Sequence, residues 1–452
     1  MPSTARSARG GPGRTRVRAR GWGVVVAGAA LLTLQTGFVV SAFGAYLVAI
    51  TAETGWNPGV VAVAFAVVQL GNGTLSPVTG WCCDRFGTRA VAGVGTILTA
   101  AGCALAAQAG SGGGFVAAIV VVALGVSAAG ITPLTVAVVQ ALTERRTLAL
   151  GLLPSGIALG GLLVPAVVWL LGATGWRTTF LVVAVITLVL GLAAVLPLPG
   201  PIERRPTRSR RRSLRRRSEV PVPAAVPDGV VVAAGAPDMD LRAAIRTSAF
   251  WLLIVGHGCA LVAVGAMNLH LIPLMTHGRG FDIQVAGLAV AGMSVTQLVG
   301  QIVTGIIGDR FDKRRLAVGC MVVQTAVLVT LAVATTLPVV IGAALVHGLA
   351  WGLRGPAMNA IRADYFGVRS FGTIMGWSMG FVSLGMLAGP LVVTAFAAGA
   401  GGYPLGFAAI TVLTVVGMVA FLVVRPPRRP ALAAAAPGAT RYGCAASPDT
   451  AA

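Results

Sequence analysis

The chain has 452 residues, of which 56% are hydrophobic and only 10% are charged. A soluble protein carries about 25% charged residues, so this composition excludes a water-soluble globule and makes lipid the solvent for most of the chain. The net charge of +21 does not indicate nucleic-acid binding, because the arginines lie in short loops and two tails between apolar runs.

Apolar runs recur along the whole chain. A bilayer crossing needs roughly 20 mostly apolar residues. The predicted spans are residues 23–50, 58–79, 89–108, 115–141, 147–171, 178–198, 249–274, 284–306, 315–336, 338–360, 370–397 and 404–424. The first run is long and no A-x-A-like site follows it, so it is predicted to be a span and not a cleaved signal peptide. These spans predict an all-α membrane protein with twelve transmembrane helices.

A polar stretch separates the sixth span from the seventh. Its beginning, residues 204–217, holds nine arginines among prolines and serines. Such a block repels itself and cannot bury a core, which predicts a disordered linker that either anchors the topology or adheres to anionic lipid. The predicted organisation is a basic N-terminal tail (1–22), a six-helix bundle (23–198), the linker (199–248), a second six-helix bundle (249–424) and a C-terminal tail (425–452).

Basic residues are distributed asymmetrically between the two sides of the membrane. With a cytoplasmic N-terminus, 31 of the 34 lysines and arginines face the cytoplasm, and the exceptions are Arg177, Arg279 and Arg354. This asymmetry predicts a multi-pass cell-membrane protein with both termini cytoplasmic. None of the six cysteines falls in an outside loop or in a metal-ligand pattern, so no metal or other cofactor is predicted.

The two halves of the chain match each other at a constant shift of 225 residues. Gly80-Trp-Cys-Cys-Asp84-Arg85-Phe-Gly87-Thr-Arg89 aligns with Gly305-Ile-Ile-Gly-Asp309-Arg310-Phe-Asp-Lys-Arg314. The same shift relates Asn57 to Asp282, Gly151 to Gly376, Gly160 to Gly385 and Pro165 to Pro390. One register held across several elements indicates a duplicated six-helix unit.

The pattern G-x-x-x-D-R-x-G-x-R between spans two and three resembles the signature loop of the major facilitator superfamily. Its degenerate second copy, the long central loop and the repeat are also similar to that superfamily. The resemblance implies two pseudo-symmetric bundles that rock around a midplane site, with spans 1, 4, 7 and 10 lining the cavity. Four segments are similar to the oxalate/formate antiporter and monocarboxylate transporter group: residues 53–57, 146–151, 175–180 and 363–372.

The signature loop and its copy are predicted to control gating. Asp84 can sit at the positive end of a neighbouring helix or pair with an arginine, while the basic residues hold the loop at the headgroups. The alternative is a topology anchor alone. The predicted gating residues are Gly80, Asp84, Arg85, Gly87, Arg89, Gly305, Asp309 and Arg310.

Arg354 is the basic residue predicted to lie inside a span. A charge within a bilayer costs at least ~2.5–3.5 kcal/mol, which favours a functional role. His347, Trp351 and Arg354 share one face of span ten, and a guanidinium can bind a carboxylate through two parallel hydrogen bonds. Two interpretations stay open: Arg354 contacts the substrate, or it is a gate or structural residue that snorkels or pairs with Asp364.

Other polar side chains are sparse in the spans and could converge on the same cavity. Individually, each is more often a contact between helices than a ligand. In span eight this chain has two glutamines where the resembling group often has an arginine. The further predicted substrate contacts are His257, Asn268, Gln297, Gln301, Tyr46, Gln69 and Asn72.

The sequence predicts a transporter and not an enzyme. It has no Walker loop and no nucleophile–base constellation. A buried cation without a buried acid favours an anionic cargo, so the predicted function is secondary transport of a mono- or dicarboxylate by alternating access. The alternative is export of an amphipathic drug or secondary metabolite. The expected partners are the lipid bilayer and a small-molecule substrate with a coupled ion or counter-substrate; the chain is expected to act as a monomer without nucleic acid.

Overall fold

The computed structural model describes residues 12–142, 146–200, 239–307, 310–367, 371–397, 399 and 402–427, and its regular elements there are all helical. Both predicted tails beyond these limits, most of the predicted linker with its arginines at 204–217, and Asp309 lie outside the described residues, as does the side chain of Asp84.

The first half of the chain builds its crossings from broken helices. The first two crossings are α1 (Pro12–Gln35) with the π-helix η1 (Thr36–Ser41) and α2 (Phe43–Thr54), then α3 (Pro58–Thr74) with α4 (Ser76–Phe86). The next two are α5 (Thr88–Ala107), then α6 (Gly112–Ala128) with α7 (Ile131–Ala141). The last elements of this half are α8 (Arg146–Leu152), α9 (Ser155–Gly160), the 3₁₀-helix η2 (Gly161–Leu163) and α10 (Val164–Val195).

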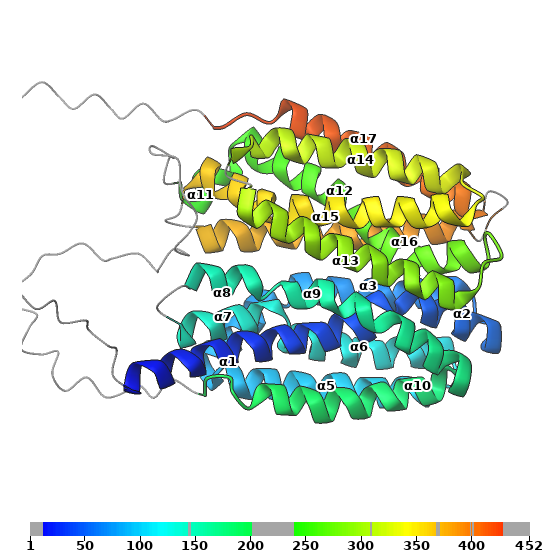
Figure 1. The fold of residues 1–452 in the computed structure, drawn as a ribbon, viewed down its shortest axis with the longest axis horizontal. Coiled ribbons are helices and arrows are strands. Elements are labelled where there is room, and N and C mark those ends of the chain that lie inside the picture. The colour runs from blue at the N-terminus through cyan, green and yellow to red at the C-terminus, as the bar shows by residue number, and fades with distance from the viewer. Residues whose placement is uncertain are drawn as a thin grey trace, which may run out of the picture.

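A turn inside α10 divides it into two crossings. Gly175 has φ of 76°, a left-handed backbone that glycine adopts without strain. The continuous apolar segment around it spans 47 residues, Ala149–Val195, which as one straight helix would be about 70 Å long, more than twice the roughly 30 Å hydrocarbon core. The chain therefore reverses at Gly175 (Figure 1).

The described residues confirm the predicted number of crossings. Ten of their helices are long and apolar enough to cross a membrane, and α3 with α4, bent by 51°, makes an eleventh. Counting Ala149–Val195 as two gives twelve. Many large apolar side chains remain exposed, among them Trp169 at 64% and Ile306 at 73%, as expected for a surface that faces lipid.

The second half of the chain uses longer, continuous helices. After the short α11 (Leu241–Ile245) come α12 (Ser248–Thr276), α13 (Ile283–Ile307), α14 (Lys313–Val333), α15 (Leu337–Phe366), α16 (Phe371–Ala397) and α17 (Gly402–Val423). The structure differs here from the predicted disordered linker, because α11 falls within it. The Asp240 side chain caps α11 by accepting a hydrogen bond from the Ala243 N–H at 2.8 Å.

Equivalent helix crossings support the 225-residue repeat. A Cβ on Gly160 would lie 3.0 Å from the carbonyl oxygen of Thr33, and a Cβ on Gly385 would lie 2.0 Å from that of Gly258. Adding 225 to the residue numbers converts Gly160 and Thr33 into Gly385 and Gly258. The same two helices thus pack closely through a glycine in each half.

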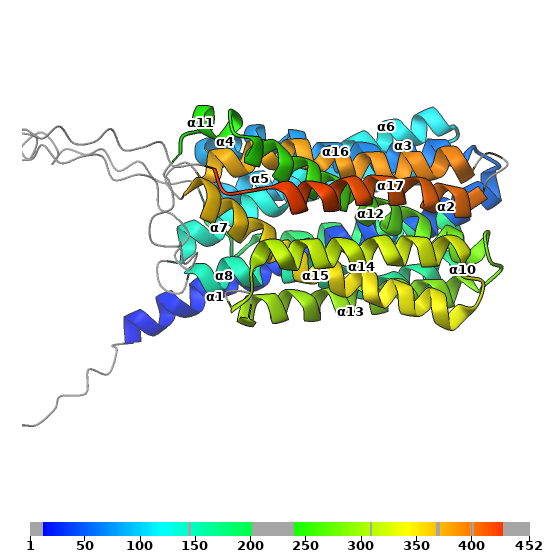
Figure 2. The ribbon, with the colours of Figure 1, turned by 90° about the horizontal axis from the view of Figure 1, so that it is seen from above.

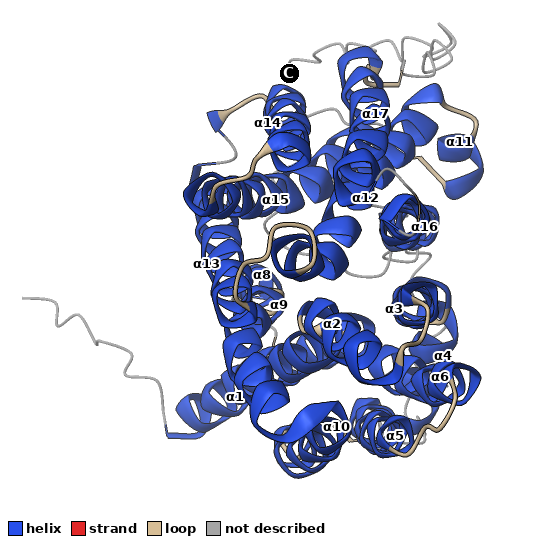
Figure 3. Cartoon of the chain, turned by 90° about the vertical axis from the view of Figure 1, so that its right-hand side faces the viewer, coloured by secondary structure: helices blue, strands red, loops and turns tan. Residues whose placement is uncertain are grey.

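The two halves lie side by side as separate helix groups (Figure 3). We call the end of the bundle where α1 begins and α17 ends the terminal end (Figures 1 and 2). Away from it, one apolar core joins α2, α3 and α10 to α12, α13 and α15. At the terminal end each half has a core of its own. The halves are therefore closed against each other at the opposite end.

Candidate functional site

Buried polar side chains gather in the C-terminal half. Arg354 on α15 is 1% exposed, and its Nη1 donates a hydrogen bond to the Gln324 Oε1 on α14. The Arg354 Nε has no hydrogen-bond partner among the described residues. The possible pairing of Arg354 with Asp364 is wrong, because the Asp364 Oδ2 accepts from the Lys313 Nζ at 2.8 Å. Arg354 therefore holds a buried charge against neutral partners.

The other two predicted members of this helix face have different surroundings. His347 is completely buried, and neither ring nitrogen has a described hydrogen-bond partner. Trp351 is half-buried. Unsatisfied buried polar atoms are costly in a folded protein and often mark functional positions. His347 and Arg354 together carry three such atoms on one face of α15.

A second buried arginine lies beyond the predicted end of span ten. The prediction ended that span at residue 360, but α15 continues to Phe366 and ends at Gly367, which has φ of 77°. Arg362 is therefore inside the helix and is 1% exposed. The signal that could have revealed it is the glycine, since helices often end at a left-handed glycine.

Arg362 joins three helices. Its Nε donates to the Ser378 Oγ on α16 at 3.0 Å, and its Nη2 donates to the His257 Nδ1 on α12 at 2.9 Å. Its Nη1 donates to the carbonyl oxygen of Met358, one turn earlier on α15, at 3.3 Å. Because a guanidinium only donates hydrogen bonds, His257 must accept through an unprotonated Nδ1. His257, predicted as a substrate contact, thus binds a residue that the prediction missed.

The remaining predicted contacts are dispersed among other helices. Asn268 on α12 is buried, with its Nδ2 unpartnered, and lies where α12 meets α2. Gln297 on α13 is buried and Gln301 is half-buried. Gln69 on α3 is buried with an unpartnered Oε1, whereas Asn72 is exposed. No hydrogen bond that the structure describes joins these side chains to Arg354 or Arg362.

Tyr46 lies in the apolar interior of the first half. Its ring centroid is 4.5 Å from that of Phe180, and Phe43 packs edge-on against it at 6.2 Å. The Tyr46 hydroxyl is buried without a described hydrogen-bond partner. Aromatic packing accounts for the position of its ring.

An arginine of each signature loop donates to a backbone carbonyl at or just beyond the end of the last helix of its half. The Arg89 Nε donates to the carbonyl oxygen of Leu198 at 2.9 Å, and the Arg314 Nε donates to that of Phe421 at 2.9 Å. A basic side chain that caps terminal carbonyls stabilises a helix end. Arg85 is exposed, with its guanidinium carbon 5.5 Å from the ring centroid of Trp81.

The other predicted gating residues are three glycines and one exposed arginine. Gly87 has φ of 84° and separates α4 from α5, a conformation that favours glycine. A Cβ on Gly80 or Gly305 would meet nothing within 4 Å. Arg310 is exposed.

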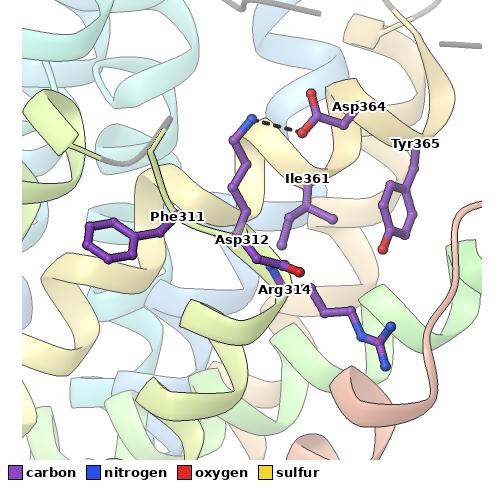
Figure 4. A pocket seen from close by; sticks show the side chains of 7 residues that line it. Phe311, Asp312, Arg314, Ile361, Asp364 and Tyr365 are labelled. Atoms are coloured by element: carbon purple, nitrogen blue, oxygen red, sulfur yellow. Dashed lines mark hydrogen bonds and ion pairs between the residues drawn. The ribbon is translucent and has the colours of Figure 1, made fainter. Parts of the chain in front are cut away.

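The second loop borders a pocket at the terminal end. It has a volume of about 240 Å³ and is lined by Phe311, Asp312, Lys313, Arg314, Ile361, Asp364 and Tyr365. The Lys313 Nζ on α14 meets the Asp364 Oδ2 on α15 at 2.8 Å, and Figure 4 marks this contact of Asp364 with a dashed line. The Asp364 Oδ1 is buried without a described partner.

Acidic side chains are scarce in the described interior. No Asp or Glu residue that the structure describes is fully buried, and Asp364, with one buried oxygen, is half-buried. No group of three or more His, Cys, Asp or Glu side chains that could hold a metal ion occurs among the described residues. The charge of the two buried arginines is thus met there by neutral acceptors.

Comparisons with known proteins agree on the fold. The family model described as Major Facilitator Superfamily matches residues 29–282 and 254–445. Monocarboxylate transporter 13 of Bos taurus is 26% identical over 300 residues, covering 64% of this chain and 62% of that protein. The alignment therefore spans about three fifths of the relative's length.

Solved structures with the same arrangement include a bacterial homolog of the human lysosomal transporter Spinster. Its inward-facing, unoccupied form has a TM-score of 0.63 at 14% identity, covering 90% of this chain and 97% of that one. Its inward-facing, occupied form has a TM-score of 0.61 at 15% identity, covering 89% and 96%. At this identity the likeness concerns the fold.

Proposed function

The chain belongs to the major facilitator superfamily of transporters, and from that premise we propose that its cargo is a small organic anion, a mono- or dicarboxylate. As a secondary transporter of this family it works by alternating access and is not an enzyme. The observation that carries the anion proposal is Arg354, a buried guanidinium with a neutral partner and an unpartnered Nε. Such a charge is stabilised by an anionic ligand.

A direct test is uptake by the purified protein in liposomes. The probes are radiolabelled pyruvate and succinate as anions, and ethidium as an amphipathic cation. The anion proposal expects saturable exchange of pyruvate or succinate. Movement of ethidium without either carboxylate would instead favour the alternative of drug or metabolite export.

The role of Arg354 is tested by comparing two substitutions. Arg354→Lys keeps the positive charge but loses the two parallel N–H donors that bind a carboxylate. Losing a hydrogen bond to a charged group costs on the order of 1.5–3 kcal/mol, which is roughly 10- to 150-fold in affinity. Arg354→Gln should bind carboxylate at least as poorly. The control is Arg246→Gln, which removes an exposed arginine and should leave affinity unchanged.

A structural arginine would give a different pattern. Near-normal affinity of Arg354→Lys, with poor accumulation of Arg354→Gln, would assign Arg354 to the scaffold. We propose that the dispersed predicted contacts Asn268, Gln297, Gln301, Tyr46, Gln69, Asn72, His347, Trp351 and His257 contribute to the same transport path.

We also propose that the signature loop governs conformational exchange. The contacts of Arg89 and Arg314 with helix ends support a mechanical role for both loops. Asp84→Asn should slow turnover in liposomes and leave equilibrium affinity for the transported carboxylate unchanged. Loss of binding by a folded variant would place Asp84 in the binding site.

The proposed orientation puts both termini in the cytoplasm of a multi-pass cell-membrane protein. α4 ends and α5 begins at the terminal end, as α13 ends and α14 begins there (Figure 1), whereas Arg177 follows the turn inside α10 and Arg279 follows α12 at the opposite end. In a variant without native cysteines, a single cysteine within residues 204–217 should resist an impermeant thiol reagent in intact cells. Labelling without permeabilisation would reverse the topology.

The packing of the halves suggests which face is open. They share a core away from the terminal end and have separate cores at it. With cytoplasmic termini, this arrangement corresponds to an inward-facing state. We propose that the unit of transport is the monomer, with a coupled ion or counter-substrate.

A further inference from the structure

Arg362 is held where two groups of helices within the C-terminal half adjoin. There α12 packs mainly on α16 and α17, whereas α15 packs mainly on α13 and α14. Arg362 reaches from α15 to His257 on α12 and to Ser378 on α16. All three side chains are at least nine-tenths buried. The guanidinium therefore connects two helix groups through polar contacts inside an apolar core.

The geometry of these contacts matches the way arginine binds a carboxylate. The Nε–H and one Nη2–H of a guanidinium point along one edge as two parallel donors, which the two oxygens of a carboxylate accept. In this structure the Ser378 Oγ accepts from Nε at 3.0 Å and the His257 Nδ1 accepts from Nη2 at 2.9 Å. Two neutral atoms from different helices thus accept from the two donors that a carboxylate would use.

The charge of Arg362 supports the same interpretation. A buried ion is stabilised well when an opposite charge and its remaining hydrogen bonds are all present. The acceptors here, an imidazole nitrogen, a hydroxyl and the Met358 carbonyl, are all neutral. A carboxylate on the same donors would add the attraction of an opposite charge, which neutral acceptors do not supply. An anion would therefore compete effectively for this edge.

The position of Arg362 along α15 separates it from Arg354. Eight residues of helix correspond to a rise of about 12 Å, and Arg362 is the nearer of the two to the terminal end. Arg354 bonds to α14, whereas Arg362 bonds to α12 and α16. Arg362 lies beside the core that belongs to the C-terminal half alone. Arg362 is thus a second buried cation, nearer to the terminal end and bonded to different helices.

We infer that Arg362, His257 and Ser378 form a second carboxylate-binding point on the terminal side of Arg354. A carboxylate replaces the Ser378 Oγ and the His257 Nδ1 on the Nε–Nη2 edge, and the bond of Nη1 to the Met358 carbonyl keeps the guanidinium in place. The two displaced side chains act as neutral placeholders that satisfy Arg362 when no anion is bound. This inference rests on the proposed transport of carboxylates.

The test measures binding of radiolabelled pyruvate and succinate to the full-length protein in detergent. Arg362→Lys should weaken the binding of at least one probe roughly 10- to 150-fold, because the parallel donors are lost. Ser378→Ala and His257→Leu each remove a competing acceptor. They should therefore tighten binding, by up to about tenfold each. A purely structural network predicts no tightening.

Arg362→Lys is expected to weaken carboxylate binding, whereas Ser378→Ala and His257→Leu are expected to tighten it. The test therefore stays decisive even when one variant fails to accumulate. If Arg362→Lys does not fold, tighter binding by Ser378→Ala and His257→Leu supports the inference, and unchanged or weaker binding by both overturns it. Unchanged carboxylate binding by a folded Arg362→Lys variant also overturns the inference. If Arg354→Lys alone loses carboxylate binding, the proposed function is still supported. Failure of the parent protein to bind either carboxylate would overturn both.

Discussion

The two halves of the chain share their helix packing but differ in the chemistry of their interiors. Under the 225-residue shift, the buried Arg354 and Arg362 correspond to Ala129 and Ala137, which are completely buried in the first half. The other two corresponding pairs are His257 with Leu32 and Ser378 with Leu153. All four first-half residues belong to one apolar core. A polar network in one half therefore takes the place of hydrocarbon packing in the other.

The ends of the helices are more alike than their interiors. The Arg177 Nη1 donates to the carbonyl oxygen of Ala107 at 2.9 Å, and the Arg279 Nη2 donates to that of Ala332 at 3.3 Å. Ala107 and Ala332 are related by the shift of 225, although the arginines are not. Terminal carbonyls need a donor in either half. The duplicated unit thus preserves what the backbone requires, while buried charge is confined to the C-terminal half of the described chain.

The largest expected effect comes from moving the charge into the first half. Ala137→Arg would bury an unpaired guanidinium among leucines, at a cost of at least ~2.5–3.5 kcal/mol. We expect a lower melting temperature in detergent and less monodisperse protein on size exclusion than for the uncharged control Ala137→Met. Adding Leu32→His and Leu153→Ser should recover part of the loss by recreating the acceptors. Equal stability of the arginine and methionine variants would contradict the proposed difference between the halves.

A smaller effect should come from the glycine contact that both halves share. Gly385→Ala places a methyl group 2.0 Å from the carbonyl oxygen of Gly258, a clash with backbone. Overpacking of this kind costs typically ~1–3 kcal/mol. Gly160→Ala should lose less, because the nearest atoms to its methyl group, the Gly37 nitrogen and the Thr36 Cβ, are 2.7 Å away. Thermal unfolding measures both losses.

The control for this pair is on the same helix. A Cβ on Gly380 would meet nothing within 4 Å, so Gly380→Ala should retain the parent melting temperature or exceed it, because alanine is the better helix former. Equal losses for Gly380→Ala and Gly385→Ala would mean that helix flexibility, and not close packing, requires the glycines.

The capping arginines should show a more modest and symmetrical effect. Arg89→Gln and Arg314→Gln each weaken hydrogen bonds to carbonyls at or just beyond a helix end, worth about 0.5–1.5 kcal/mol each. We expect similar decreases in melting temperature for the two variants. Arg310→Gln, at an exposed position within the second loop, should change the melting temperature little. A large effect in one half alone would show that the two loops have diverged in role.

The smallest expected effect is the ion pair found in the second half. Lys313 and Asp364 meet at 2.8 Å with side chains 17% and 23% exposed, while Thr88 and Val139 occupy the corresponding first-half positions. A double-mutant cycle with Lys313→Met and Asp364→Asn should give a coupling of ~0–1 kcal/mol. This coupling should fall as salt is raised. A larger, salt-independent coupling would identify the pair as a latch of the second loop.

Composition and linear spacing were sufficient to establish the class of the protein. The low proportion of charged residues indicated a membrane protein, and the apolar runs predicted twelve crossings. The signature loop and its copy 225 residues later indicated the duplication. These properties follow from hydrophobicity and covalent order, which do not depend on which helices become neighbours. The described residues and the family comparison confirm the fold and the superfamily.

The candidate site required the tertiary structure. Helical periodicity put His347 and Arg354 on one face, but it could not say that this face meets Gln324 on α14. Hydropathy ended span ten before Arg362, because Arg362 and Asp364 lower the average, although the helix continues and buries the arginine. The pairing of Arg362 with His257, 105 residues away in sequence, was likewise decided by tertiary packing. A buried charge is stabilised by whichever acceptors the neighbouring helices bring to it, and sequence separation carries no information about that contact.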